Sequence, residues 1–186
     1  MNESTSQILV VRYDPAWPIR FDELHARLWP HLRDLASALE HVGSTSVPGL
    51  VAKPVIDLDV IVRSPSAIGR CVDRLDALGY VYLGELGVPD RHAFKSPSGT
   101  FAHHLYVCLD GSASLRNHLL LREHLRLHPE EARAYGDLKR RLADLHPNDI
   151  EAYVDGKTEF ILQILSSHGM STREMAEVRE VNMLPG

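Results

Sequence analysis

The stretch that decides the fold is HVGSTSVPGLVAKPVIDLDVIV, residues 41–62. Its second half is an apolar run that predicts a β-strand, yet it contains two acidic residues, Asp57 and Asp59. Successive side chains of a strand point to opposite faces, so two residues with this spacing share one face. A buried charge without a partner costs several kcal/mol. We therefore expect one face of this strand to enter the core and the other to meet water, a cation or an ion-pair partner.

The composition is that of an ordinary globular domain. The chain has 186 residues, of which 44% are hydrophobic and 24% charged, and its net charge is −5. This length suits one domain that needs no disulfides. The negative charge argues against a broad nucleic-acid surface but allows a local basic pocket. The two cysteines, Cys71 and Cys108, show no metal-binding spacing, so we do not expect structural zinc.

The N-terminal sequence MNESTSQILVVRYDP lacks the basic start and apolar stretch of a secretion signal. No segment reaches the roughly 18 consecutive apolar residues that a membrane-spanning helix needs. We therefore expect a cytoplasmic protein with reduced thiols and no membrane contact. The 11 histidines are scattered along the chain, and we expect most of them to lie on the surface or to serve packing.

The segments around the central strand predict both helices and strands. Apolar residues recur at helical spacing from Ile19 to Leu39, and Pro30 should kink that helix or start a second one. Before it, QILVVRY predicts a short strand or an extended arm. Later segments predict, in order, a helix from Ser64-Pro65 to Gly79, a strand at YVYLGEL (80–86), a loop at GVPDRHAFKSPSG (87–99) and a strand at FAHHLYVCL (101–109).

Beyond Gly111 the apolar spacing is helical. Ser112 is a candidate N-cap, Pro129 should start a second helix, and a third should follow it. Ser171 and Glu174 form a capping-box pattern that predicts a short terminal helix.

This order of elements predicts an α/β (α+β) fold, with a small mixed β-sheet flanked by helices and a helical C-terminal subdomain. We expect one domain over residues 1–168, with its sheet core at about 10–110 and its helical part at about 111–168. Residues 169–186 should form a tail with a short helix.

The central stretch combines two features that suit phosphate chemistry. Two carboxylates on one strand face can hold Mg²⁺, which prefers oxygen ligands and often binds substrate phosphates as well. The GSTS segment offers backbone N–H groups and hydroxyls that can cradle a phosphate, and Lys53 adds a positive charge. Alone, each feature also fits an ordinary solvated strand face or a commonplace turn.

The spacing of the two features is more specific. Gly-Ser is followed 13 residues after the serine by Asp-x-Asp, which resembles the signature of the nucleotidyltransferase superfamily with the polymerase-beta-like fold. The whole stretch HVGSTSVPGLVAKPVIDLDV resembles the hallmark of the GrpB family, a branch of that superfamily. YDPAWPIRFDEL, the block that begins HHLYVCLDGSASLRNHLLLREHLRLHPEEARAY, and YVDGKTEFI resemble further family segments. The resemblance covers about residues 10–166.

The resemblance implies a nucleotide bound together with two divalent metal ions, Mg²⁺ or Mn²⁺, that are held by three carboxylates. Asp57 and Asp59 match the first two, but the strand that should carry the third contains no acid. His104 is our candidate for that position, as a metal ligand or a general base, and Tyr106 stands where relatives carry a second histidine. Asp110, at the end of the strand, is a weaker alternative for the third carboxylate.

The resemblance also implies nucleotide-binding residues. Gly43 and Ser44 match the phosphate-binding pair, with Thr45 in the same turn. The helical subdomain of related enzymes supplies basic residues to the triphosphate and an aromatic ring to the base. The positions that match this pattern are Arg122, Lys139, Tyr153 and Lys157. The plainer interpretation is that these charges lie on a solvated helix face and that the tyrosine is partly core. Arg91 and His92, in the 87–99 segment, are weaker candidates for the same cleft.

Three functions remain open at this point. The first is a nucleotidyltransferase that moves a nucleotidyl group from an NTP to an unknown acceptor. The second is a module that binds a nucleotide or another phosphorylated ligand without turnover, because the third carboxylate is missing. The third is an interaction protein with a vestigial site. The acceptor, the preferred base, the number of metals and the oligomeric state are not readable from these residues.

Overall fold

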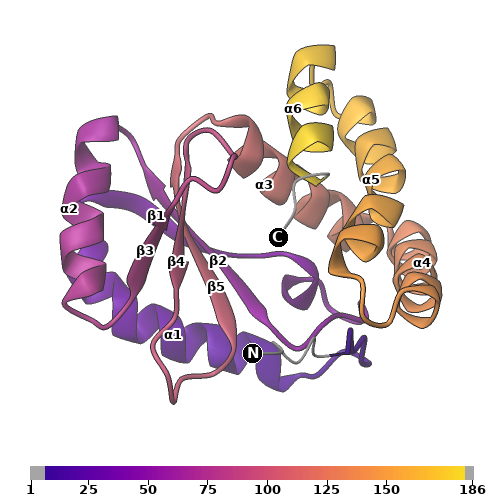
Figure 1. Ribbon diagram of the computed structural model, residues 1–186, viewed down its shortest axis with the longest axis horizontal. Helices are drawn as coiled ribbons and strands as arrows, with labels where there is room; N and C mark the ends of the chain where they lie inside the picture. Colours follow the sequence, from indigo (N-terminus) through magenta and orange to yellow (C-terminus); the bar gives the residue numbers. More distant parts are fainter. Residues whose placement is uncertain (1–6, 183–186) are drawn as a thin grey trace.

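A mixed five-stranded sheet forms the centre of the protein, whose computed structural model describes residues 7–182 (Figure 1). Its strand order is β1-β2-β5-β4-β3. The strands are β1 (Ala36–Val42), β2 (Ile56–Val62), β3 (Val81–Gly84), β4 (Arg91–Lys95) and β5 (His103–Leu109). Strands β2 and β5 are parallel, and the other neighbouring pairs are antiparallel. The predicted fold class is therefore confirmed.

Two groups of helices accompany the sheet. The helices are α1 (Ala16–Leu32), the 3-10 turn η1 (Ser44–Ser46), α2 (Pro65–Asp76), α3 (Ala113–Leu127), α4 (Pro129–Leu145), α5 (Ile150–Ser167) and α6 (Thr172–Asn182). Helices α1 and α2 pack on the sheet in the main hydrophobic core, while α3 to α6 gather beside it as a helical half (Figure 1). No helix of this described part is long and apolar enough to cross a membrane.

Strand β2 carries the core on one face and the two aspartates on the other. Leu58 and Val60 are fully buried beneath α1 and α2, as the alternation predicts. Asp57 pairs in register with His104 of β5, and Asp59 pairs with Tyr106. The parallel pairing therefore puts His104 on the aspartate face, beside the first carboxylate.

The predicted helix up to Leu39 is wrong in its last part. Helix α1 continues over Pro30 but ends at Leu32, and residues 36–42 form edge strand β1 instead. Leu35 and Leu39 are both buried, but their spacing of four fits two strand repeats as well as one helical turn. Periodicity alone did not separate the two possibilities.

The predicted loop over 87–99 is also wrong in part, because it contains strand β4. This segment, RHAFK, is short and polar, so its own sequence gives a weak strand signal. It is stabilised by antiparallel pairing with β3 on one side and β5 on the other. The QILVVRY segment is an extended arm that makes a single bridge, between Val11 and Ala52.

The capping signals of the helical half are confirmed. Ser112 Oγ accepts from the backbone N–H of Leu115 at the start of α3. At the start of α6, Ser171 and Glu174 exchange side-chain and backbone hydrogen bonds. Helix α6 packs on α3 and α5, and its buried Val178 joins their hydrophobic core.

Candidate functional site

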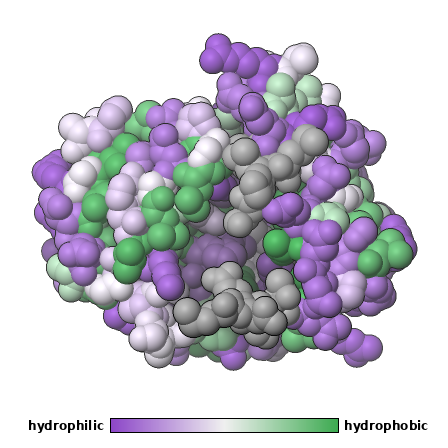
Figure 2. Space-filling view, in the orientation of Figure 1, coloured by the Kyte–Doolittle hydropathy of each residue, from purple (hydrophilic) through white to green (hydrophobic). Residues whose placement is uncertain are grey.

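A cavity of about 190 Å³ lies between the sheet and the helical half. Figure 2 shows hydrophilic residues in the recess between these two parts of the molecule. The cavity is lined by residues from the η1 loop, β2, β5, α4 and α5, namely Ser44, Thr45, Ala52, Lys53, Val55, Asp57, His104, Lys139, Tyr153, Val154 and Lys157. Folding thus brings together eight of the residues that the sequence nominates.

The η1 loop passes close over the aspartate strand, and Gly43 makes this possible. Its φ of +68° lies in the left-handed region, and a Cβ built there would lie 2.9 Å from Asp57 Cγ and collide with the carboxylate. Ser46 closes the turn, since its Oγ donates to the Gly43 carbonyl at 2.6 Å. Only glycine therefore lets the loop lie against this carboxylate.

A buried histidine holds the same loop from the other side. His41 Nε2 lies 3.0 Å from Thr45 Oγ1, and the imidazole stacks on Phe21 with ring centroids 4.8 Å apart. Burial lowers the pKa of His41 to about 4. The histidine is therefore neutral at physiological pH and serves to position the loop.

Asp57 and His104 form the floor of the cavity. His104 Nδ1 donates to Asp57 Oδ1 at 2.8 Å, and the side chains are 50% and 29% exposed for His104 and Asp57, respectively. Both groups remain open to the cavity, so either one could contact a ligand. Asp110 is exposed at the end of β5 and is not among the cavity residues.

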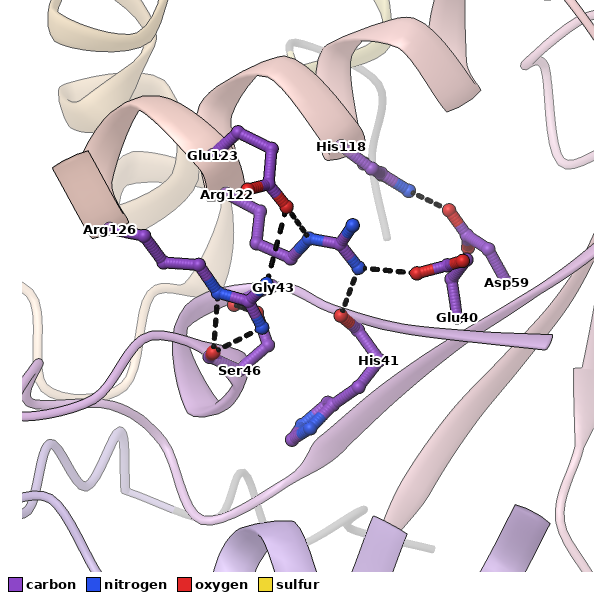
Figure 3. A network of polar contacts seen from close by, with 9 residues as sticks. All are labelled: Glu40, His41, Gly43, Ser46, Asp59, His118, Arg122, Glu123 and Arg126. Carbon is purple, nitrogen blue, oxygen red and sulfur yellow. Dashed lines mark hydrogen bonds and ion pairs between the residues drawn. The ribbon is translucent and has the colours of Figure 1, made fainter. Parts of the chain in front are cut away.

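Asp59 lies deeper and is wholly buried. Its Oδ2 accepts from His118 Nδ1 of α3 at 2.7 Å, whereas its Oδ1 has no hydrogen-bond partner within residues 7–182 (Figure 3). Burial lowers the pKa of His118, but the charge and hydrogen bond of Asp59 raise it by more, so the net pKa is raised. A buried carboxylate oxygen without a partner is costly. A cation beside this oxygen would remove that cost.

Three lysines give the cavity a positive wall. Lys139 Nζ donates to Ser44 Oγ at 2.8 Å and to the Val51 carbonyl. Lys157 Nζ lies 4.4 Å from the centre of the Tyr153 ring. Burial and the neighbouring Lys157 lower the pKa of Lys139 to about 7. Burial and Lys53 lower the pKa of Lys157 to about 8. A bound polyanion would stabilise the protonated lysines.

Tyr153 is a wall of the cavity more than a surface for stacking. Its side chain is only 2% exposed and packs in a small core with Leu142 and Ala143. Its ring supports the ammonium group of Lys157. The plainer interpretation of this tyrosine, as partly core, is therefore the one that fits its packing.

Arg122 lies outside the cavity. Its guanidinium donates to Glu40 Oε2 at 2.7 Å and to the His41 carbonyl at 2.8 Å, so it ties α3 to β1 (Figure 3). The neighbouring Arg126 donates to the Ser46 carbonyl and thereby holds the η1 loop. The two weaker candidates of β4 also lie outside the cavity: Arg91 stacks on Tyr106, and His92 bonds Tyr82.

Sequence reasoning missed two residues on the aspartate side of the sheet. Glu40 pairs in register with Asp59 across β1 and β2, but the helical interpretation of that segment concealed its strand alternation. His118 comes from helix α3, and no local pattern links a helical histidine to an aspartate 59 residues earlier. Only the packing of α3 on the sheet reveals that contact.

The fold has a counterpart among solved structures. Cid1 poly(U) polymerase, solved with MgGTP bound, superimposes with a TM-score of 0.53 at 17% identity, over 73% of this chain and 44% of that chain. Identity at this level shows the fold alone, which is that of nucleotidyltransferases.

The family follows from closer matches. The sequence profile described as GrpB protein matches residues 7–167, so the chain belongs to the GrpB family. The crystal structure of conserved protein GrpB from Enterococcus faecalis shares 34% identity, with a TM-score of 0.76, over 92% of this chain and 98% of that chain. UPF0157 protein YqkA of Bacillus subtilis is 36% identical over 155 residues, covering 83% of this chain. The match spans only 45% of the length of that relative.

Proposed function

We propose that this protein is a metal-dependent nucleotidyltransferase, which transfers a nucleotidyl group from an NTP to an acceptor still to be identified. The observation that carries the proposal is the cavity itself. It places a carboxylate and a histidine opposite three lysines and a glycine-serine turn. This is the charge arrangement that a nucleoside triphosphate with its metal ion requires.

The chain's own residues divide the work of binding. Gly43 keeps the turn close to Asp57, and Ser44 and Thr45 face the cavity where phosphates would lie. The positive charges that would bind the triphosphate belong to the three cavity lysines, Lys53, Lys139 and Lys157. Tyr153 supports the Lys157 ammonium group and forms the cavity wall beside it. Arg122 would act indirectly, because it holds β1 and the adjacent backbone.

The residues present fit a divalent cation. Asp57 and His104 line the cavity and offer ligand atoms, whereas Asp59 is wholly buried behind them and does not complete a three-ligand cluster in this arrangement. Mg²⁺ favours the carboxylates, and Mn²⁺ also accepts imidazole. Such an ion would neutralise charge on the transferring phosphoryl group. As the alternative to binding the ion, His104, whose Nδ1 is hydrogen-bonded to Asp57, would use its other ring nitrogen to accept a proton from an acceptor that enters the cavity.

A second candidate function is nucleotide or phospholigand binding without turnover. It is favoured by a specific observation, the presence of His104 at the β5 position in register with Asp57, where a third carboxylate is expected. A site with two carboxylates could still hold a metal–phosphate complex while lacking the full charge set for transfer.

Isothermal titration calorimetry with ATP, GTP, CTP and UTP, with and without Mg²⁺ or Mn²⁺, tests binding. We expect metal-dependent binding that is lost in Asp57→Asn/Asp59→Asn and retained in Asp110→Asn, whose side chain lies outside the cavity. Absence of binding to all four nucleotides would reject the transferase and the nucleotide-binding form of the second function, and would leave a non-nucleotide phospholigand to be tested in the same cavity. Pyrophosphate release in the presence of candidate acceptors then separates them, because only the enzyme releases it and only with Asp57 intact.

A further inference from the structure

A second cluster of potential metal ligands lies in the helical half, away from the candidate active site. His124 lies in the last turn of helix α3, His128 occupies the junction between α3 and α4, and Glu131 lies in the first turn of α4. One ligand atom from each of these residues lies within 4.8 Å of the others. None of the three lines the cavity at Asp57.

His124 is the anchor of this cluster. It is 6% exposed, its Nε2 lies 2.9 Å from Glu131 Oε2, and its Nδ1 lies 2.8 Å from Nε2 of His168. His168 follows the C-terminus of α5, so three helices meet at this imidazole. A hydrogen-bond partner on the far nitrogen fixes the ring of a metal-binding histidine and selects its tautomer. His168 is positioned to provide that support.

We propose that His124, His128 and Glu131 bind one Zn²⁺ or similar transition-metal ion, which clips the α3–α4 junction. Two imidazoles and a carboxylate form a donor set typical of zinc, with a fourth position left for water. Imidazole ligands favour such ions over Mg²⁺. The expectation of no structural zinc rested on the cysteines and did not consider ligands that meet only after folding.

Binding requires one local rearrangement. The His124 and His128 rings are stacked, with centroids 4.0 Å apart and 17° between their planes. An ion shared by two imidazoles lies in the plane of each ring, so the His128 ring must turn out of this stack and give up the hydrogen bond between its Nδ1 and the His124 carbonyl. His128 is exposed, which leaves room for the rotation and gives the ion access from solvent. The buried His124 keeps its position.

The ion would reinforce a junction that also supports the η1 loop. Arg126, between the two histidines in sequence, donates two hydrogen bonds to the Ser46 carbonyl. The bound ion would therefore stabilise the same end of helix α3 that holds the η1 loop in place. The proposed ion site stands independently of the proposed nucleotidyl transfer.

The test uses the full chain after removal of metal with a chelator. Zn²⁺ is titrated calorimetrically, and Co²⁺ is followed by its visible absorption. We expect one Zn²⁺ per chain, at least about tenfold weaker binding in His128→Ala/Glu131→Gln, and a change in the His128 ring-proton NMR shifts on Zn²⁺ binding. Both substituted residues are exposed, so the variant should fold.

Two controls make the result decisive. His31→Ala removes an exposed histidine outside the cluster, and Asp57→Asn/Asp59→Asn removes the candidate active-site carboxylates. Both should leave Zn²⁺ affinity unchanged. The proposal is overturned if the unmodified chain binds no Zn²⁺, if His128→Ala/Glu131→Gln binds it as tightly, or if only the aspartate variant loses it.

Discussion

The Asp59 carboxylate and the His118 imidazole are 2.7 Å apart, although 59 residues separate them in the chain and the aspartate is wholly buried. The pair joins strand β2 to helix α3. It thus fastens the helical half to the sheet directly beside the candidate site.

His118→Ala should destabilise the protein because it leaves a buried carboxylate without its partner. We expect a loss of about 1–3 kcal/mol in the free energy of unfolding, measured by urea denaturation. Adding Asp59→Asn removes the stranded charge, so the double variant should lose less than the sum of the single losses. A single variant as stable as the unmodified chain would show that the pair contributes nothing.

Gly43→Ala should cost stability and ligand binding together. The added Cβ collides with the Asp57 carboxylate, and the alanine must adopt the left-handed φ of this position. Together these effects should lower the free energy of unfolding by about 1–3 kcal/mol. Gly49→Ala is the matched control, because its φ is +80° but nothing lies within 4 Å of the added atom. Urea denaturation and nucleotide titration of both variants separate the collision with Asp57 from the backbone strain that both positions share. Equal losses in the two variants would contradict the close approach at Gly43.

Lys139 should make stability depend on pH. Its pKa of about 7 in the folded chain lies below the ordinary value of 10.5, so the unfolded chain binds more protons between those values. The contribution of Lys139 therefore becomes more favourable as pH rises from 7 toward 10.5, by at most about 1.4 kcal/mol per pH unit. Urea denaturation at several pH values, compared with Lys139→Met, isolates this slope. Parallel curves for the two proteins would contradict the shifted pKa.

Substitutions at Arg122 and Lys157 should have different effects, because one residue supports the fold and the other is proposed to bind the ligand. Arg122→Met removes hydrogen bonds to Glu40 and to the His41 carbonyl, so it should lower the free energy of unfolding by about 1–3 kcal/mol. Lys157→Met replaces a buried cavity ammonium, so it should weaken nucleotide binding without a similar loss of stability. Denaturation and calorimetry of both variants provide the comparison. The opposite pattern would indicate that Arg122 contributes to phosphate binding and that Lys157 is structural.

The sequence predicted the aspartate face correctly because its signals are local. Apolar residues alternate around Asp57 within one strand, and Gly43 marks a turn that needs a positive φ. The nomination of Lys139 and Lys157 depended on the family resemblance, since charged residues on helices usually face solvent. Both lysines line the cavity, and their role in binding a nucleotide stays a prediction.

The remaining features depend on contacts between distant segments. Strand β4 is defined by its neighbours more than by its own polar sequence, and β1 shares a spacing that suits either helix or strand. Arg122 fits a basic helical pattern, yet its hydrogen-bond partner is Glu40 of strand β1, which lies 82 residues earlier in the chain. Local periodicity contains no information about such partners.

The residues lining the cavity extend along the chain from Ser44 to Lys157. During synthesis the sheet strands emerge from the ribosome first, and the two helical lysines emerge later. Until α5 is available, the cavity has Lys53 and Lys139 but lacks Lys157 and Tyr153. Nucleotide binding would then report completion of the domain, and fragments that end before α5 should fail to show it.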